Sequence, residues 1–184
     1  MSRTAYKFKK LISSSLVNLS VYKTLLRTLL LFLYLGLALS ACQKNASSEE
    51  FGKLIANLKD MQGNPVLFAG PEDQKLLVHF WATWCKPCLE ELPALLRAKE
   101  TLEKKKFRIL LVSEESVEEI NSYLKKKEIN LESVRYNGAL TDLKIHALPA
   151  TFVFNEKGEK IFRKSGRIDW DSEEEIQQIL NPHK

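Results

Sequence analysis

Two cysteines, Cys85 and Cys88, lie three residues apart in the segment HFWATWCKPCLEELP, which runs from His79 to Pro93. Cysteines at this spacing are typical of a metal site, a structural disulfide, or a redox couple that alternates between dithiol and disulfide. A structural zinc site needs four ligands, and the sequence offers no second pair at this spacing. A disulfide between neighbouring helical turns closes a very short loop and adds little stability. The redox couple is therefore favoured, with zinc, a purely structural disulfide and a copper carrier as alternatives.

The elements around the cysteines explain why such a pair would be reactive. KLLVHFWA, residues 75–82, is a short apolar run rich in strand-forming residues, which predicts a strand buried on both faces. The next segment has leucines at helical spacing, so a helix begins at the cysteines. Its free N–H groups and dipole favour a thiolate, and Lys86 adds a cation. We therefore expect Cys85 to be the exposed nucleophile and Cys88 the thiol that resolves a mixed disulfide.

The rest of the chain predicts an α/β domain with a central mixed β-sheet and helices on both faces. Strand-like apolar runs alternate with helical patterns, and residues 151–164 predict a hairpin around a tight glycine turn. Ser116, followed three residues later by Glu119, is a capping box and predicts a helix start. FGKLIANL and PVLFA flank the turn-like segment KDMQGN, which predicts an N-terminal β-hairpin extension.

The N-terminal region has the pattern of a secretory signal peptide. Residues 1–41 carry six basic and no acidic residues, and they end in the apolar run LLLFLYLGLALSA. This run is shorter than the roughly 20 residues that span a membrane, and an uncleaved short anchor is the alternative. LSAC, which ends at Cys42, resembles a bacterial lipobox, and the resemblance implies that Cys42 is acylated and holds the chain to a lipid membrane. We therefore expect a flexible tether over 42–50 and a folded domain over 51–184.

The basic charge of the whole chain belongs to this leader. Removing its six basic residues from 28 leaves 22, against 23 acidic residues, so the remaining chain is close to neutral. The charge therefore gives no argument for a nucleic-acid partner. The leader predicts an extracytoplasmic, lipid-anchored protein, on the periplasmic face of the inner or outer membrane if the cell is Gram-negative. Gln43 lacks the acidic character of an inner-membrane signal and leans toward the outer membrane. Disulfides persist in such compartments.

FWATWCKPCLEELP resembles the active-site segment of thioredoxin-like proteins, and more narrowly that of the TlpA/ResA-like membrane-tethered thiol–disulfide oxidoreductases. The resemblance covers roughly residues 54–180 in element order. IHALPATFVFNEKG matches a second motif of the family, in which a cis-proline lies opposite the cysteine pair. The match implies that the bond between Leu148 and Pro149 is cis. It also implies that Trp84, Leu148 and Pro149 bind the substrate peptide and that Pro149 shields the sulfurs from metals.

Two residues near the cysteines carry further expectations. Glu91 occupies a position where the family often has a glutamate that tunes proton transfer of the cysteines, and the alternative is a solvated helix glutamate. His79 departs from the family, which has an aspartate or asparagine there. A histidine changes its charge near neutral pH, so His79 could relay protons beneath Cys88, or it could simply be a buried, hydrogen-bonded side chain. His146, three residues before Pro149, is expected at the rim of the site.

The resemblance implies a protein-disulfide reductase that needs no cofactor. Its substrates would be oxidised cysteines of exported proteins, including the haem-binding cysteines of apocytochrome c. A reductant in an oxidising compartment must be recharged, which implies a membrane electron-passing thiol reductase as partner. The sequence leaves open a disulfide oxidase or isomerase, and a non-catalytic binding lipoprotein in which the Cys85–Cys88 disulfide stays closed.

Overall fold

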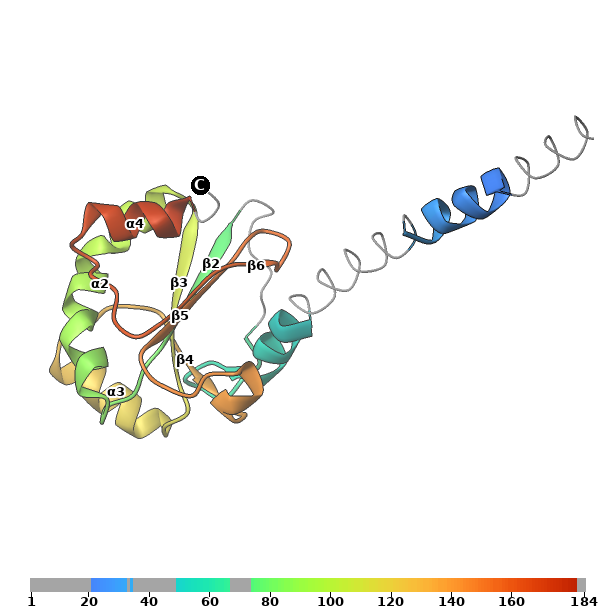
Figure 1. Cartoon of the computed structure of the whole chain (residues 1–184). Coiled ribbons are helices and arrows are strands. Elements are labelled where there is room, and N and C mark those ends of the chain that lie inside the picture. The colour runs from blue at the N-terminus through green and yellow to red at the C-terminus, as the bar shows by residue number, and fades with distance from the viewer. Residues whose placement is uncertain (1–20, 33, 35–48, 67–73, 182–184) are drawn as a thin grey trace, which may run out of the picture. The chain divides into compact units, whose positions relative to one another are not determined.

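The computed structural model of the chain describes residues 21–32, 34, 49–66 and 74–181 (Figure 1). The chain divides into two compact units, residues 1–45 and 46–184, and each is described by itself.

The first unit contributes a helical segment, residues 21–32 and 34, whose side chains are exposed. Within the described ranges, no helix combines the length and the apolar character needed to cross a membrane. The lipobox-like segment and Cys42 lie outside the described residues. The signal peptide and the acylation of Cys42 therefore stay predictions.

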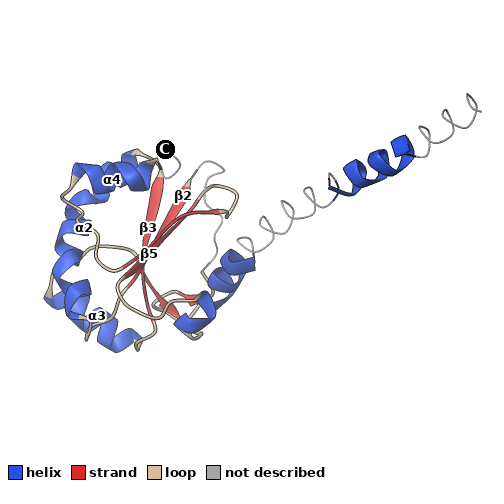
Figure 2. Cartoon of the chain, viewed as in Figure 1, coloured by secondary structure: helices blue, strands red, loops and turns tan. Residues whose placement is uncertain are grey.

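The second unit is a six-stranded mixed sheet with helices on both faces (Figure 2). The strand order is β1-β4-β3-β2-β5-β6. Strand β2 is central, parallel to β3 and antiparallel to β5. The predicted central mixed sheet is thereby confirmed. In chain order the elements are β1 (Leu58–Lys59), β2 (Lys75–Phe80), α2 (Lys86–Lys104), β3 (Phe107–Ser113), α3 (Val117–Lys126), β4 (Ser133–Tyr136), the 3-10 helix η1 (Leu140–Leu143), β5 (Ala150–Phe154), β6 (Lys160–Ser165) and α4 (Glu173–Leu180).

Two apolar clusters fill the space on either side of the sheet. One cluster joins the sheet to α2, α3 and α4, and the other joins it to the helix of residues 49–57 and to η1 (Figure 1). Strand β2 contributes to both, because Leu77 belongs to the α2 side while Val78 and Phe80 belong to the opposite side. Every residue of β2 after Lys75 is buried, as predicted for a strand covered on both faces.

The predicted N-terminal hairpin is wrong in its first arm. Residues 49–57 form a helix, and β1 has only two residues, Leu58 and Lys59. The reason is the spacing of the apolar side chains Phe51, Leu54, Ile55 and Leu58, which is helical and places them together against the sheet. Among the described residues, the rest of the predicted hairpin is a turn and one antiparallel bridge between Lys59 and Pro65, and residues 67–69 of its second arm lie outside them.

The predicted tether also needs a correction at its end. Its last two residues, Glu49 and Glu50, are helical, and the Glu50 carboxylate pairs with the Lys160 ammonium at 2.5 Å. The other tether residues lie outside the described ranges, so their flexibility stays a prediction.

Two local predictions are confirmed. The capping box is complete, since Ser116 accepts from the Glu119 N–H and the Glu119 carboxylate accepts from the Ser116 N–H. The late hairpin forms from β5 and β6, and its turn places Gly158 at a φ of 73°. Glycine adopts this left-handed conformation without steric cost.

Candidate active site

Cys85 and Cys88 lie where strand β2 gives way to helix α2. Cys85 is the N-cap of the helix, and Cys88 lies one turn inside it. The two sulfurs are joined in a disulfide with an S–S distance of 2.03 Å. The Cys88 N–H donates to Cys85 Sγ at 3.3 Å, so a free N–H of the helix end points at this sulfur. Such an environment favours a thiolate when the disulfide is open.

The expected exposure of Cys85 needs a correction. In the disulfide form Cys85 is 4% exposed and Cys88 is fully buried. The residue before them, Trp84, is instead 73% exposed. The cause is the capping position, which turns the Cys85 sulfur toward the first helical turn while the preceding loop residue projects outward. Trp84 is therefore the large exposed side chain next to Cys85 in the sequence.

A carboxylate from another loop holds the segment before the cysteines. Glu115, which follows β3, accepts hydrogen bonds from the Thr83 N–H at 2.7 Å and from the Thr83 hydroxyl at 2.5 Å. Ser113, the last residue of β3, donates its hydroxyl to the same carboxylate. Sequence reasoning missed both Thr83 and Glu115, because neither spacing nor residue type links positions 32 residues apart.

Leu148 and Pro149 lie at the same end of the central strands as the cysteine segment. Phe80, the last residue of β2, pairs with Ala150, the first residue of β5, so the residues after Phe80 and before Ala150 are neighbours. The bond between Leu148 and Pro149 is cis, which confirms the expected isomer. Leu148 packs against the apolar cluster that includes both cysteines, and Pro149 is buried.

Beneath the cysteines, Glu91 and His79 form a buried pair. Glu91 is 2% exposed and His79 is fully buried, and their facing atoms Oε1 and Nε2 lie 3.2 Å apart. The other Glu91 oxygen accepts from the Ile168 N–H at 2.8 Å. On the far side of the imidazole, Nδ1 lies 3.0 Å from the Thr151 hydroxyl oxygen. A solvated helix glutamate is therefore excluded for Glu91, whereas its neighbour Glu90 is exposed.

The remaining candidate groups lie outside this buried pair. His146 is exposed in the loop between η1 and Pro149. Among the described residues, no group of three or more His, Cys, Asp or Glu side chains is arranged to hold a metal ion. Cys42 lies outside the described residues. Of the site residues predicted from the sequence, the structure brings together Cys85, Cys88 and Glu91 with the Leu148–Pro149 loop, and His79 lies against Glu91.

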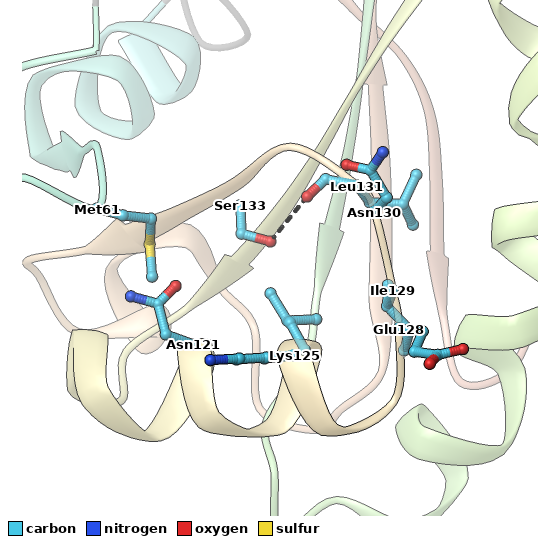
Figure 3. A pocket seen from close by; sticks show the side chains of 9 residues that line it. Met61, Asn121, Lys125, Glu128, Ile129, Asn130, Leu131 and Ser133 are labelled. Carbon is cyan, nitrogen blue, oxygen red and sulfur yellow. Dashed lines mark hydrogen bonds between the residues drawn. The ribbon is translucent and has the colours of Figure 1, made fainter.

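Two cavities differ in their relation to this site. One, of about 510 Å³, lies beside the C-terminal end of α3, where Met61, Asn121 and Lys125 line it (Figure 3), and it holds none of the candidate residues. The other, of about 290 Å³, is lined by Glu91 together with residues from α2 and from the segment 167–171. The second cavity therefore lies beside Glu91 of the buried pair.

Known proteins share both the sequence pattern and the fold of this domain. The model of the AhpC/TSA family matches residues 55–161, which is more than half of the chain. The chain belongs to the AhpC/TSA family. Two relatives of this AhpC/TSA chain are the thioredoxin-like protein YneN of Bacillus subtilis, 28% identical over 110 residues, and the thiol-disulfide oxidoreductase ResA of Oceanobacillus iheyensis, 28% identical over 115 residues.

The matches cover only part of these relatives. They span 55% of this chain and 62% of YneN, and 61% of this chain and 55% of ResA. Among solved structures, the exposed lipoprotein thioredoxin Etrx1 of Streptococcus pneumoniae superposes with a TM-score of 0.56 at 21% identity, over 68% of this chain and 97% of that chain. At this identity the likeness concerns the fold, and the thioredoxin-like fold expected from the sequence is confirmed.

Proposed function

We propose that the chain is a thiol–disulfide oxidoreductase that exchanges dithiol for disulfide through Cys85 and Cys88. The observation that carries the proposal is the Cys85–Cys88 disulfide at the N-terminus of α2, with Cys85 as the cap. Both the helix end and the N–H that points at Cys85 favour a thiolate there once the bond opens. The ResA relative is itself named a thiol-disulfide oxidoreductase, which supports the same activity in this chain.

The reaction proceeds through a mixed disulfide. The Cys85 thiolate attacks one sulfur of a substrate disulfide, and the other substrate sulfur leaves with the electron pair. Cys88 then loses its proton and attacks Cys85 Sγ, which releases the second substrate thiol and closes the Cys85–Cys88 disulfide. Two electrons pass from the protein dithiol to the substrate. The exposed Trp84 ring and the backbone beside Leu148 and Pro149 provide the surface that holds the substrate peptide.

The cellular setting is part of the proposal. Cys42 is acylated after removal of residues 1–41, and the domain works on the extracytoplasmic side of a membrane as a reductant. Its substrates are oxidised cysteines of exported proteins, with those of apocytochrome c as one example, and a membrane thiol reductase restores its dithiol. The lipobox-like LSAC segment supports the anchor, and Etrx1, which has the same fold, is described as a lipoprotein.

A trapping experiment tests the activity. Cys88→Ser removes the resolving thiol, so clients should accumulate as mixed disulfides on Cys85 in the producing cell. Cys85→Ser is the matched control and should trap none. The trapped clients identify the substrates. Absence of trapping, together with a disulfide that does not titrate, would refute the enzyme.

A redox titration of the wild-type domain decides the direction of electron flow. A reductant is expected near the value of about −270 mV known for thioredoxin, whereas an oxidase lies near about −120 mV. The low exposure of Cys85 favours one rival, a binding protein whose disulfide stays closed. That rival predicts that strong thiol reductants leave the bond intact in the folded chain and that Cys85→Ser leaves activity unchanged.

A further inference from the structure

His79 and Glu91 are two ionisable side chains that are removed from water and depend on each other. Apart from their 3.2 Å approach, neither His79 Nε2 nor Glu91 Oε1 has a hydrogen-bond partner among the described residues. A single buried charge without a partner is strongly unfavourable, whereas an ion pair with hydrogen bonds at its outer atoms is tolerated. In this pair the outer atoms are occupied, by the Ile168 N–H on Glu91 and by the Thr151 hydroxyl on His79.

The two arginines near Glu91 are each paired with another carboxylate, so His79 is the cationic partner for Glu91. Arg97 is bound to Asp171 at 2.6 Å and Arg167 to Glu90 at 3.0 Å. The ring of Trp170 lies edge-on to His79, with the ring centres 6.1 Å apart. On β3, the register partner of His79 is the apolar Leu111. The cavity that Glu91 lines also carries the charged residues Glu90, Arg97, Arg167, Asp169 and Asp171, and Cys88 lies one turn before Glu91 on α2. From β6 and α4, Lys164, the register partner of Thr151, is bound to Glu175 at 2.6 Å.

Glu91 is also placed beneath the resolving cysteine. It follows Cys88 by three residues, and both lie on the buried face of α2, where side chains three apart are neighbours. We propose that His79 is a positioning residue that keeps Glu91 ionised and oriented, so that Glu91 accepts the proton of Cys88 during the resolution of the mixed disulfide. This inference rests on the proposed dithiol–disulfide exchange.

Atoms and electrons balance in this step. Before resolution, Glu91 is a carboxylate against protonated His79, and Cys88 is a thiol. The Cys88 proton moves to Glu91, and the Cys88 thiolate attacks Cys85 Sγ, which releases the substrate thiolate with the electron pair of the broken S–S bond. Glu91 then gives its proton to water through the cavity it lines, which restores the pair.

Without His79, the same carboxyl would lose its function as a base. A carboxyl in a dry environment without a cation takes up a proton and stays neutral. Neutral Glu91 cannot accept a second proton, and Cys88 would then depend on hydroxide or another base from solvent. The two residues should therefore act as a unit, and removing either should give the same defect.

The test uses the reduced full chain with Cys42→Ser, which leaves Cys85 and Cys88 as its only thiols and serves as the background for every variant, and the small disulfide 5,5′-dithiobis(2-nitrobenzoate). Its first coloured thiol reports the attack by Cys85, and its second reports the resolution by Cys88. In His79→Gln the first phase should match wild type, and the second should slow by about tenfold or more at pH 6. The deficit should shrink toward pH 9, where hydroxide removes the Cys88 proton. Glu91→Gln and the double variant should show the same loss as His79→Gln.

Leu77→Ala is the matched control, because Leu77 is fully buried two residues before His79 and faces the same side of β2. It loses packing but keeps the pair, so its second phase and pH profile should follow wild type. A second phase in His79→Gln equal to wild type across pH 5–9, or losses that multiply in the double variant, would overturn the inference. A wild-type chain that releases no second thiol contradicts the proposed function itself.

Infrared spectroscopy of the oxidised wild-type chain provides a test that needs no folded His79 variant. Subtracting the spectrum of Glu91→Gln from that of wild type isolates the Glu91 carboxyl. An ionised carboxylate at pH 7 supports the proposal. A protonated carboxylic acid at that position overturns it, whatever the kinetics of the variants.

Discussion

The two carboxylate oxygens of Glu115 each accept a hydrogen bond from Thr83, which lies two residues before Cys85. The contact joins the loop after β3 to the loop after β2, at the edge where the cysteines lie. Ser113 adds a third hydrogen bond to the same carboxylate. The turn that presents Cys85 is therefore fixed from outside its own segment.

Removing this contact should loosen the turn that carries Cys85. We expect Glu115→Ala to lower the free energy of unfolding by about 1–3 kcal/mol, because hydrogen bonds to a charged acceptor are lost. The attack of Cys85 on a small disulfide should slow in parallel. Urea denaturation and the first kinetic phase measure the two effects. Glu118→Ala, at an exposed position of α3, should change the stability by less than about 0.5 kcal/mol, and an equal loss there would contradict the assignment.

Two tryptophans near the site should behave in opposite ways. Trp84 is 73% exposed, so Trp84→Ala should leave the melting temperature nearly unchanged. It should raise the KM for a disulfide-bonded peptide several-fold, because an exposed aromatic side chain beside a site commonly anchors a partner. Trp170 is buried, and Trp170→Ala should cost about 3–5 kcal/mol of stability. An unchanged KM in Trp84→Ala would remove this residue from the substrate surface.

The ion pair between Arg97 and Asp171 should stabilise the fold in a pH-dependent manner. The hydrogen bond from Arg97 holds the pKa of the Asp171 carboxyl below its ordinary value of 3.8. Because the pKa is lower in the folded chain, the stabilisation is present above pH 3.8 and is lost as the pH falls through the folded value. Asp171→Asn should therefore reduce stability at pH 6 and reduce it less at pH 3, because the carboxyl is partly protonated once the pH falls below 3.8.

Salt provides the control for this pair. Both side chains are more than half exposed, so the difference between wild type and Asp171→Asn should be small and should decrease at 1 M NaCl. Denaturant titrations at the two pH values and the two salt concentrations measure it. A difference that grows as the pH falls would be inconsistent with a lowered pKa of Asp171 in the folded chain.

The corrected N-terminal helix can be tested through Gly158. A Cβ at this position would lie 2.7 Å from Phe51 Cδ1, and the φ of 73° disfavours a side chain as well. Gly158→Ala should therefore cost at least about 1 kcal/mol. Combining it with Phe51→Ala should cost less than the sum of the two, because the clash is relieved.

Gly63 is the matched control for this prediction. Its φ is 86°, but nothing lies within 4 Å of a Cβ built there. Gly63→Ala should show the backbone cost alone and no coupling to Phe51. Additive losses for Gly158→Ala and Phe51→Ala would mean that the helix of residues 49–57 does not pack against the β5–β6 turn.

The sequence predicts those parts of the fold whose signal is local. The apolar run of β2, the leucine spacing of α2 and the capping box at Ser116 each lie within one segment, and all three appear as expected. The turn-like segment KDMQGN led to the prediction that FGKLIANL, which precedes it, is a strand of a hairpin. Its apolar residues Phe51, Leu54, Ile55 and Leu58 follow the helical period instead, and packing against the sheet decides the outcome.

In the candidate site, too, contacts within one segment could be predicted from the sequence, and contacts between distant segments could not. Cys85, Cys88 and Glu91 share one helix, so their proximity follows from sequence spacing. The partners His79, Thr151 and Ile168 come from β2, from β5 and from the segment after β6, and the contacts of Thr151 and Ile168 span 72 and 77 positions. Strand order and register, which only the folded sheet supplies, bring these residues together.

The segment that follows β6 is attached to α2 at three successive points, where Arg167 meets Glu90, Ile168 meets Glu91 and Asp171 meets Arg97. Residues 167–171, near the C-terminal end of the domain, thus form one wall of the cavity beside the Glu91 carboxyl group. Engineering at this end therefore needs care. A fusion joined or a truncation made between Ser165 and α4 would disturb the hydrogen bond from Ile168 to Glu91 as well as the stability of the fold, while one placed beyond α4 would leave that wall intact.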